Sequence, residues 1–180
     1  MRVITGSARG RRLKTPEGYD VRPTTDTVKE AMFNIIQGDI EGRRVLDLFA
    51  GTGQLGIECL SRGARDAVFI DSSRQSLALV EENLRACGFK GQTVNTDALS
   101  FIARGGKYDI ILVDPPYDAG LYESVLEAIT RFDILTDGCI IIMDSRRERQ
   151  MPEPAGPYLK VREYNYGRVK LTLYTKRTEQ

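Results

Sequence analysis

The chain has 180 residues, 41% of them hydrophobic, and a formal net charge of +1 at pH 7. This size and apolar content predict one domain, residues 1–180, with a core large enough to fold unaided. No segment has the length and hydrophobicity of a membrane span, and the polar N-terminus is unlike a signal peptide. We therefore expect a cytoplasmic protein with no membrane partner.

Histidine and cysteine usage narrows the chemistry. The chain contains no histidine, which excludes acid–base catalysis by imidazole and argues against a transition-metal site. Cys59, Cys87 and Cys139 lack the spacing of metal ligands and lie in apolar segments. We expect them to be reduced core cysteines, and we expect no metal.

Basic residues gather near the two ends of the chain. The first fifteen residues contain Arg2, Arg9, Arg11, Arg12 and Lys14 and no acid. A second basic segment near the C-terminus contains Lys160, Arg162, Arg168, Lys170, Lys176 and Arg177. Such clusters are more often solvated faces than binding surfaces, so charge alone does not identify a nucleic-acid-binding protein.

The N-terminal segment, residues 1–40, is predicted to be a basic hairpin followed by a helix. The hairpin pairs residues 2–5 with residues 11–14 across a glycine-containing turn. In the helix, Thr27 and Glu30 have the spacing of a capping box. The helix's expected apolar face consists of Val28, Ala31, Met32, Ile35 and Ile36.

Residues 41–180 alternate strands and helices in the pattern that builds a parallel sheet. Strands are expected at 45–49, 67–70, 92–95, 108–113 and 139–143, and helices at 54–62, 74–87, 98–104 and 122–132. Two alternating runs, 158–164 and 168–176, then predict an antiparallel hairpin. The expected fold is α/β and Rossmann-like, with a mostly parallel sheet.

A glycine turn follows the first of these strands. Gly51, Gly53 and Gly56 have the spacing of a dinucleotide fingerprint, and Asp71 lies at the end of the next strand. The pattern favours a cofactor site, although a glycine turn can also serve strand–helix packing alone.

The residue Asp47 distinguishes between two cofactors. Its carboxylate would repel the pyrophosphate of a dinucleotide at a cost of about 1 kcal/mol or more, but it would attract the ammonium and sulfonium of S-adenosylmethionine. Asp71 is then placed to accept hydrogen bonds from ribose hydroxyls. Asp97 can accept from the adenine amine or cap the next helix, and these two roles are compatible. The candidate cofactor-binding residues are Asp47, Phe49, Gly51, Thr52, Gly53, Asp71, Ser72, Asp97 and Ala98.

The segment Asp114-Pro115-Pro116-Tyr117 ends the buried strand at 108–113. The two prolines lack N–H donors and hold the backbone extended, so main-chain carbonyls project without a local partner. Acceptors beside the flat face of Tyr117 suit a planar group that carries an amine, such as a nucleobase. A proline-rich loop with a buried tyrosine is the simpler alternative for this segment alone.

Together these motifs resemble the RsmD family, bacterial Class I methyltransferases that use S-adenosylmethionine to methylate guanine N2 in 16S ribosomal RNA. The resemblance rests on residues 6–13, 22–24, 29–34, 45–53, 60–64 and 114–117. Two departures are visible: Asp71 stands where the family commonly has glutamate, and Thr52 where serine is frequent.

The resemblance implies a seven-stranded sheet in which one late strand is antiparallel. It implies that Asp114 and the Pro115 carbonyl accept from guanine N2, and that Tyr117, after Pro116, stacks on the base. The amine's proton passes to Asp114 or to water. The implied RNA contacts are Arg9, Arg11, Arg12, Lys14, Arg22 and Thr24. The implied substrate is an assembled or partly assembled small subunit, and we expect a monomeric enzyme.

Three alternatives remain open at this level. A related enzyme could methylate adenine N6 or a protein glutamine, although those relatives commonly carry Asn at the position of Asp114. A nicotinamide oxidoreductase is disfavoured by Asp47. A non-catalytic RNA-binding assembly factor would have no need to keep Asp47, Asp71 and the Asp114–Tyr117 segment together.

Overall fold

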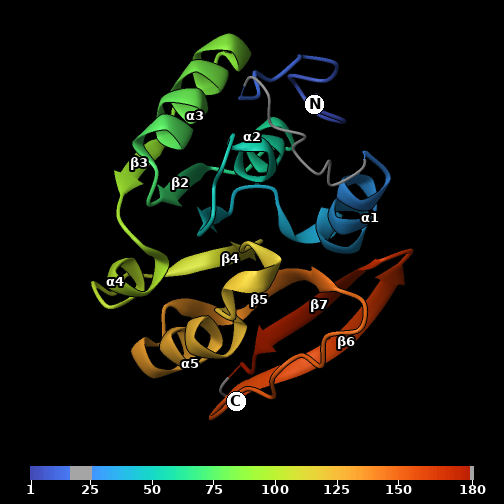
Figure 1. Ribbon diagram of the computed structural model, residues 1–180, viewed down its shortest axis with the longest axis vertical. Helices are drawn as coiled ribbons and strands as arrows, with labels where there is room; N and C mark the ends of the chain where they lie inside the picture. Colours follow the sequence, from blue (N-terminus) through green and yellow to red (C-terminus); the bar gives the residue numbers. More distant parts are fainter. Residues whose placement is uncertain (17–25, 179–180) are drawn as a thin grey trace.

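The computed structural model describes residues 1–16 and 26–178. Its centre is a seven-stranded sheet (Figure 1). Across the sheet the order is β3 (Gln92–Asn95), β2 (Asp66–Asp71), β1 (Arg44–Asp47), β4 (Tyr108–Val113), β5 (Leu135–Arg146), β7 (Val169–Lys176) and β6 (Tyr158–Tyr166). The first five are parallel, and β7 runs antiparallel to both β5 and β6. The predicted fold class is confirmed.

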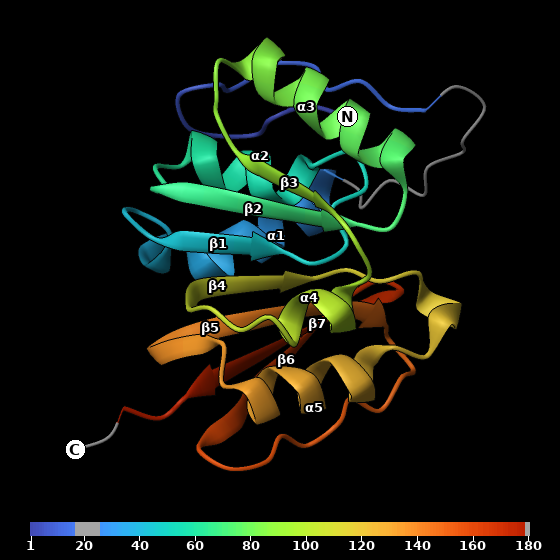
Figure 2. The same cartoon turned by 90° about the vertical axis from the view of Figure 1, so that its left-hand side faces the viewer.

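Helices cover both faces of this sheet (Figure 2). α1 (Asp26–Ile36), α2 (Gln54–Ser61) and α3 (Arg74–Cys87) pack on one face, and α4 (Ala98–Ile102) and α5 (Tyr122–Phe132) on the other. The short 3₁₀ turns are η1 (Gln37–Asp39) and η2 (Tyr117–Ala119). Apolar residues of β4 such as Ile110 and Ile111 are fully buried, because the strand is covered on both faces. No helix in the described ranges is both long and apolar enough to cross a membrane.

The observed element bounds differ from the expected ones in informative places. β5 is longer than predicted at both ends: Leu135 already pairs with Tyr108 of β4, and pairing with β7 continues beyond the apolar run to Arg146. The α4 helix ends at Ile102 rather than at residue 104. Cys59 and Cys139 are buried as expected, whereas Cys87 is partly exposed, and all three thiols are free.

One expectation for the N-terminal segment is wrong and another is only partly right. Thr27 lies inside α1, which begins at Asp26, so Thr27 cannot be the N-cap of a capping box. Val28, Met32 and Ile36 are buried as expected. Lys29 and Phe33 join them on the buried face, whereas Ala31 and Ile35 are only partly buried. The periodicity placed the face slightly wrongly because a lysine was not counted as a core residue.

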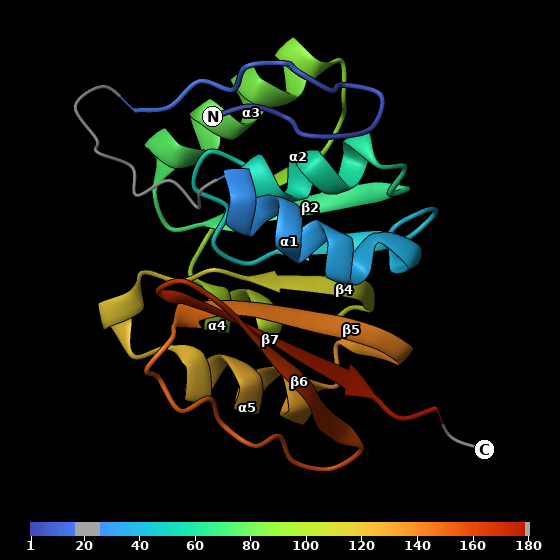
Figure 3. The same ribbon diagram turned by 90° about the vertical axis from the view of Figure 1, so that its right-hand side faces the viewer.

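The basic hairpin forms as an arm, here the residues 1–16, with a single antiparallel bridge between Arg2 and Arg12 in place of two regular strands. The arm lies along α2 and α3 (Figure 3). The Ala8 N–H donates to Ser61 Oγ at 2.9 Å, and the Lys14 N–H donates to Asn83 Oδ1 at 2.7 Å. Backbone hydrogen bonds such as Val3 N–H to the Arg11 carbonyl, at 2.9 Å, hold the two halves of the arm together, and the contacts with α2 and α3 hold the arm against the domain.

The buried Glu58 side chain joins three parts of the chain. It accepts hydrogen bonds from the Ile4 and Thr5 N–H groups of the arm, at 2.8 and 2.9 Å. It also forms ion pairs with Lys29 of α1, at 3.0 Å, and with Arg62 after α2, at 2.9 Å. Glu58 is 0% exposed, and burial lowers the pKa of Lys29. A charge removed from water in this way requires all of its partners.

A second buried carboxyl lies at the start of α2. Asp47 ends β1, is 1% exposed, and accepts the Gly56 N–H at 3.0 Å. Burial raises the pKa of Asp47 to about 7, and the nearby Asp71 carboxylate acts in the same direction. Asp47 therefore connects β1 to the first turn of α2, where helix N–H groups need acceptors.

Replacing Glu58 by Ala should lower the free energy of unfolding by about 3–5 kcal/mol, because Lys29 and the arm N–H groups lose their buried partner. The matched control is Glu82→Ala, which breaks the exposed Lys14–Glu82 pair and should change stability far less. Urea unfolding of both variants measures the difference. Equal losses would show that burial does not strengthen the Glu58 network.

Replacing Asp47 by Asn should change how stability depends on pH. Between its ordinary pKa and about 7, Asp47 is ionised in the unfolded chain and protonated in the folded protein. Wild-type stability therefore falls as the pH rises, by up to about 1.4 kcal/mol per pH unit from this group. The advantage of Asp47→Asn in urea unfolding should grow from pH 5 to pH 7 and then level off. Parallel profiles would contradict the raised pKa.

Candidate active site

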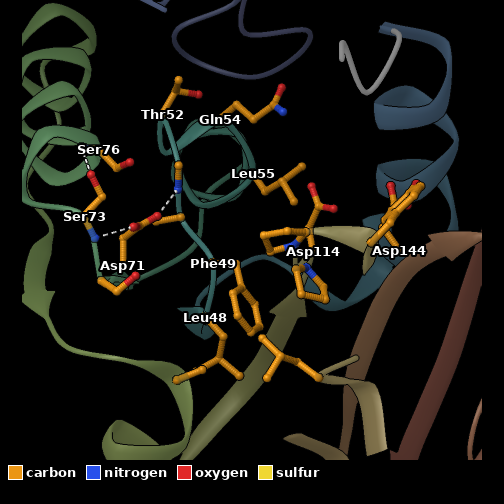
Figure 4. Close-up of a pocket in the computed structure, with 18 of the residues that line it drawn as sticks. Leu48, Phe49, Thr52, Gln54, Leu55, Asp71, Ser73, Ser76, Asp114 and Asp144 are labelled. Atoms are coloured by element: carbon orange, nitrogen blue, oxygen red, sulfur yellow. Dashed lines mark hydrogen bonds between the residues drawn. The ribbon is translucent and has the colours of Figure 1, made fainter. Parts of the chain in front are cut away.

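A cavity of about 910 Å³ lies at the carboxyl ends of the parallel strands (Figure 4). Its lining consists of Met1, Pro16, Leu48, Phe49, Ala50, Gly51, Thr52, Gln54, Leu55, Asp71, Ser72, Ser73, Gln75, Ser76, Leu79, Thr96, Asp97, Ala98, Leu99, Asp114, Pro115, Pro116, Tyr117, Asp118, Leu121, Val125, Asp144, Arg146 and Val169. β1 and β4 are neighbours whose following helices lie on opposite faces. Ligands of open α/β sheets bind at such a switch point.

The glycine turn forms one wall of this cavity. Gly51 has φ 55° and Gly53 has φ 79°, values that favour glycine. A Cβ on Gly56 would lie 2.3 Å from the Phe69 ring, so only glycine lets α2 pack this closely on β2. Gly51 lines the cavity, whereas Gly53 and Gly56 do not. Two of the three glycines therefore serve turn geometry and packing.

Asp71 ties this turn to the next strand and helix. One carboxylate oxygen accepts the Gly51 N–H at 2.9 Å, and the other accepts the Ser73 N–H at 2.8 Å (Figure 4). Ser73 in turn caps α3 by accepting the Ser76 N–H at 3.2 Å. Asp71 is thus held rigidly at the cavity edge, and each of its oxygens retains a further lone pair for a ligand.

Asp97 has the capping role that the sequence indicated. Its side chain accepts the Ser100 N–H at 2.9 Å at the start of α4, and this hydrogen bonding lowers the pKa of Asp97. Asp97 also lines the cavity together with Ala98. A carboxylate that stays ionised at the cavity edge is a suitable acceptor for an amine.

The Asp114–Tyr117 segment lies at the opposite wall from Asp71. Val113 and Met143 are paired across β4 and β5, so Asp114 and Asp144 follow on adjacent parallel strands. In Figure 4 Asp114 and Asp144 both lie on the side of the cavity away from Asp71. The Tyr117 hydroxyl donates to Asp144 Oδ1, and Asp144 is 2% exposed.

Several predicted residues lie away from the cavity lining. Asp47 does not line the cavity, and its carboxyl accepts the Gly56 N–H behind the glycine turn. Its contact with a ligand's ammonium stays a prediction. Arg9, Arg11 and Arg12 are exposed on the arm, and Lys14 pairs with Glu82 at 2.6 Å. Arg22 and Thr24 lie outside the described residues.

The structure also adds residues that sequence reasoning missed, chiefly Asp144 and Arg146. Asp144 ends the buried apolar run of β5, just as Asp47 ends β1 and Asp114 follows β4. That repeated pattern, an acid at the carboxyl end of a parallel strand, was available in the sequence. Met1 was also missed; its Sδ lies 3.3 Å from Thr52 Oγ1, so the arm reaches the cavity edge.

Comparison with known proteins places the chain in a family. The family model "Conserved hypothetical protein 95" matches residues 1–175. The chain is 37% identical to YlbH of Bacillus subtilis (strain 168), over 98% of this chain and 100% of that protein. It is 35% identical to the Escherichia coli (strain K12) protein named Ribosomal RNA small subunit methyltransferase D, over 99% of this chain and 91% of that protein.

Solved structures agree with the observed fold. The structure of yhhF from Escherichia coli matches with a TM-score of 0.89 at 35% identity, covering 99% of both chains. A Thermus thermophilus 16S rRNA N2 G1207 methyltransferase in complex with AdoMet and guanosine shares the fold, with a TM-score of 0.71 at 21% identity, covering 90% of this chain and 45% of that one. The chain therefore belongs to the RsmD family, as its motifs predicted.

Proposed function

We propose that this protein transfers a methyl group from S-adenosylmethionine to the exocyclic N2 amine of a guanine in small-subunit ribosomal RNA. The proposal is carried by one observation: the glycine turn and the Asp114–Tyr117 segment line the same cavity. Two similar proteins support the same activity. The Escherichia coli relative is named a small-subunit rRNA methyltransferase, and the Thermus thermophilus protein is a 16S rRNA N2 methyltransferase.

The residues present fit S-adenosylmethionine. Asp71 offers carboxylate acceptors to ribose hydroxyls, and Asp97 offers one to the adenine amine. Phe49 and Leu99 add apolar surface to the lining of the same cavity, and Gly51 lets a ligand approach the backbone closely. When bound, the cofactor supplies an electrophilic methyl group. The protein's part is to hold the acceptor nitrogen in line with it.

The part of the cavity lined by the Asp114–Tyr117 segment fits guanine. The lone pair of an exocyclic amine is delocalised into the ring, so acceptors on its N–H groups favour a more pyramidal and more nucleophilic nitrogen. Asp114 and the Pro115 carbonyl provide such acceptors, and Tyr117 provides a stacking face. An ionised carboxylate only accepts hydrogen bonds, which suits the adjacent N1–H and N2–H donors of guanine. The proton leaves to Asp114 or to water.

The substrate must bring a base out of any stack to reach this cavity. We propose that Arg9, Arg11 and Arg12 of the arm contact the RNA backbone, because they are exposed and no ion pair engages them within the described residues. The arm touches the cavity edge through Met1, so RNA bound there lies close to the acceptor site. We take the acting form to be a cytoplasmic monomer, with an assembled or partly assembled small subunit as substrate.

Wild-type protein with labelled S-adenosylmethionine should form N2-methylguanosine in unmodified small subunits, with free 16S rRNA and DNA tested in parallel. Asp114→Ala should lower the rate about 100-fold or more, because the amine loses its acceptor. Asp66→Ala is the matched control, since this partly exposed acid begins β2 at the opposite end of the sheet. Nucleoside mass spectrometry identifies the product.

Labelled methyl groups recovered in adenine or in protein would show that the enzyme methylates one of these in place of guanine N2. If Asp114→Ala transferred methyl groups at the wild-type rate, Asp114 would have no role in the mechanism. Cofactor binding without transfer to any of these acceptors would favour the non-catalytic assembly factor.

The triple variant Arg9→Ala, Arg11→Ala, Arg12→Ala should bind subunits more weakly, with a shallower dependence on salt. For every phosphate that an arginine no longer neutralises, the slope of log affinity against log salt should fall by roughly 0.7–0.9. A control variant, Arg104→Ala with Arg131→Ala, removes exposed charge near α4 and α5 on the other face of the sheet. Binding curves at several salt concentrations separate the two. Equal slopes for wild type and the triple variant would remove the arm from the RNA interface.

A further inference from the structure

Asp144 is held unusually firmly for a residue at a cavity wall. It lies near the end of β5, between β4 and β7, and its backbone pairs with Leu171. Its main-chain carbonyl accepts the Tyr122 hydroxyl of α5 at 2.9 Å. Only 2% of Asp144 is exposed, yet it lines the cavity. A buried carboxyl in such a place needs a partner, and it has one in the Tyr117 hydroxyl.

Tyr117 belongs to a much less regular part of the chain. It opens the three-residue turn η2, directly after the two prolines. Two residues of β5 hold it. Asp144 accepts its hydroxyl, and the Arg146 guanidinium lies 5.8 Å from the centre of its ring. Arg146 also forms an exposed ion pair with Asp118, with 3.0 Å to each carboxylate oxygen.

These two strand residues lie on the same face of β5, because side chains alternate along a strand. The rigid strand β5 therefore holds the Tyr117 ring in two ways: Asp144 accepts its hydroxyl, and Arg146 lies over its face. A stacking ring aligns a base only if the ring cannot rotate or tilt, and small errors in alignment cost large factors in rate.

We propose that Asp144 is a positioning residue for methyl transfer, acting through its hydrogen bond with Tyr117 to fix the ring against which the acceptor base stacks. The proposal rests on the proposed function for its kinetic consequence. The structural part, that Asp144 orders Tyr117, stands apart from the identity of the methyl acceptor.

A double-mutant cycle tests this role. Asp144→Ala and Tyr117→Phe should each lower kcat about tenfold to 100-fold. The double variant should be no worse than Tyr117→Phe alone, because the two residues act as one unit. Asp144→Asn keeps an acceptor oxygen and should recover most of the rate, whereas a role that depends on charge would leave it as slow as Asp144→Ala. The KM for S-adenosylmethionine should stay within about twofold of wild type.

Tyr174→Phe is the matched control. It removes another buried tyrosine hydrogen bond on β7, next to β5, where the Tyr174 hydroxyl donates to the Pro152 carbonyl at 3.0 Å, and it should retain wild-type kcat. A large loss in this variant, equal to that of Asp144→Ala, would show that packing near β5 matters and the carboxylate does not. Additive losses in the cycle would show that Asp144 acts on substrate directly, and would overturn the proposal.

A second readout does not use activity. The chain has 8 tyrosines, so ring-labelled tyrosine gives a small set of NMR signals, and Tyr117→Phe identifies the signal of Tyr117. This signal should broaden or split in Asp144→Ala and stay single in Asp144→Asn. An unchanged Tyr117 signal in Asp144→Ala would overturn the proposal whatever the methyl acceptor proves to be. Failure to form N2-methylguanosine with a normal NMR result would instead count against the proposed function.

Discussion

The neighbouring strands β1 and β4 lead to opposite faces of the sheet, and the rest of the site depends on this divergence. The chain leaving β1 turns into α2 on one face, and the chain leaving β4 passes through η2 to α5 on the other. No helix of the described residues closes the space between the two exits, so a cavity forms there. Groups from distant parts of the chain meet in it because parallel strands end at the same edge.

Two buried carboxyl groups keep the elements around this cavity in place. Asp47 holds the first turn of α2 against β1, and Glu58 holds the same helix against α1 and the arm. Each carboxyl is costly to bury, and each is satisfied by groups that only the folded chain brings together. Since the glycine turn leads directly into α2, anchoring that helix at two points also fixes the turn. The same two buried carboxyls therefore stabilise the fold and hold the glycine turn, which forms one wall of the cavity.

The acceptor wall uses two carboxylates from adjacent strands in different ways. Asp114 follows β4 beside the prolines and lines the cavity, whereas the Asp144 carboxylate accepts a hydrogen bond from the Tyr117 hydroxyl. In the proposed roles, Asp114 takes part in the chemistry and Asp144 holds the Tyr117 ring in position. It also explains why a short loop, which carries little regular hydrogen bonding of its own, can present an aromatic face in a fixed place.

Much of this protein could be predicted from sequence, because the determining signals are local. The alternation of buried strands and amphipathic helices predicted the parallel sheet. The glycine turn and the Asp114–Tyr117 segment, together with residues 6–13, 22–24, 29–34 and 60–64, predicted the family. Long-range contacts decided the rest. Lys29 is buried only because Glu58 meets it from another helix. Asp47 leaves the cavity lining because Gly56 takes its carboxyl, and Asp144 gains its partner because β5 lies beside β4. Sequence spacing shows which residues share a face, but the partner of a buried charge depends on which segments the tertiary structure brings together.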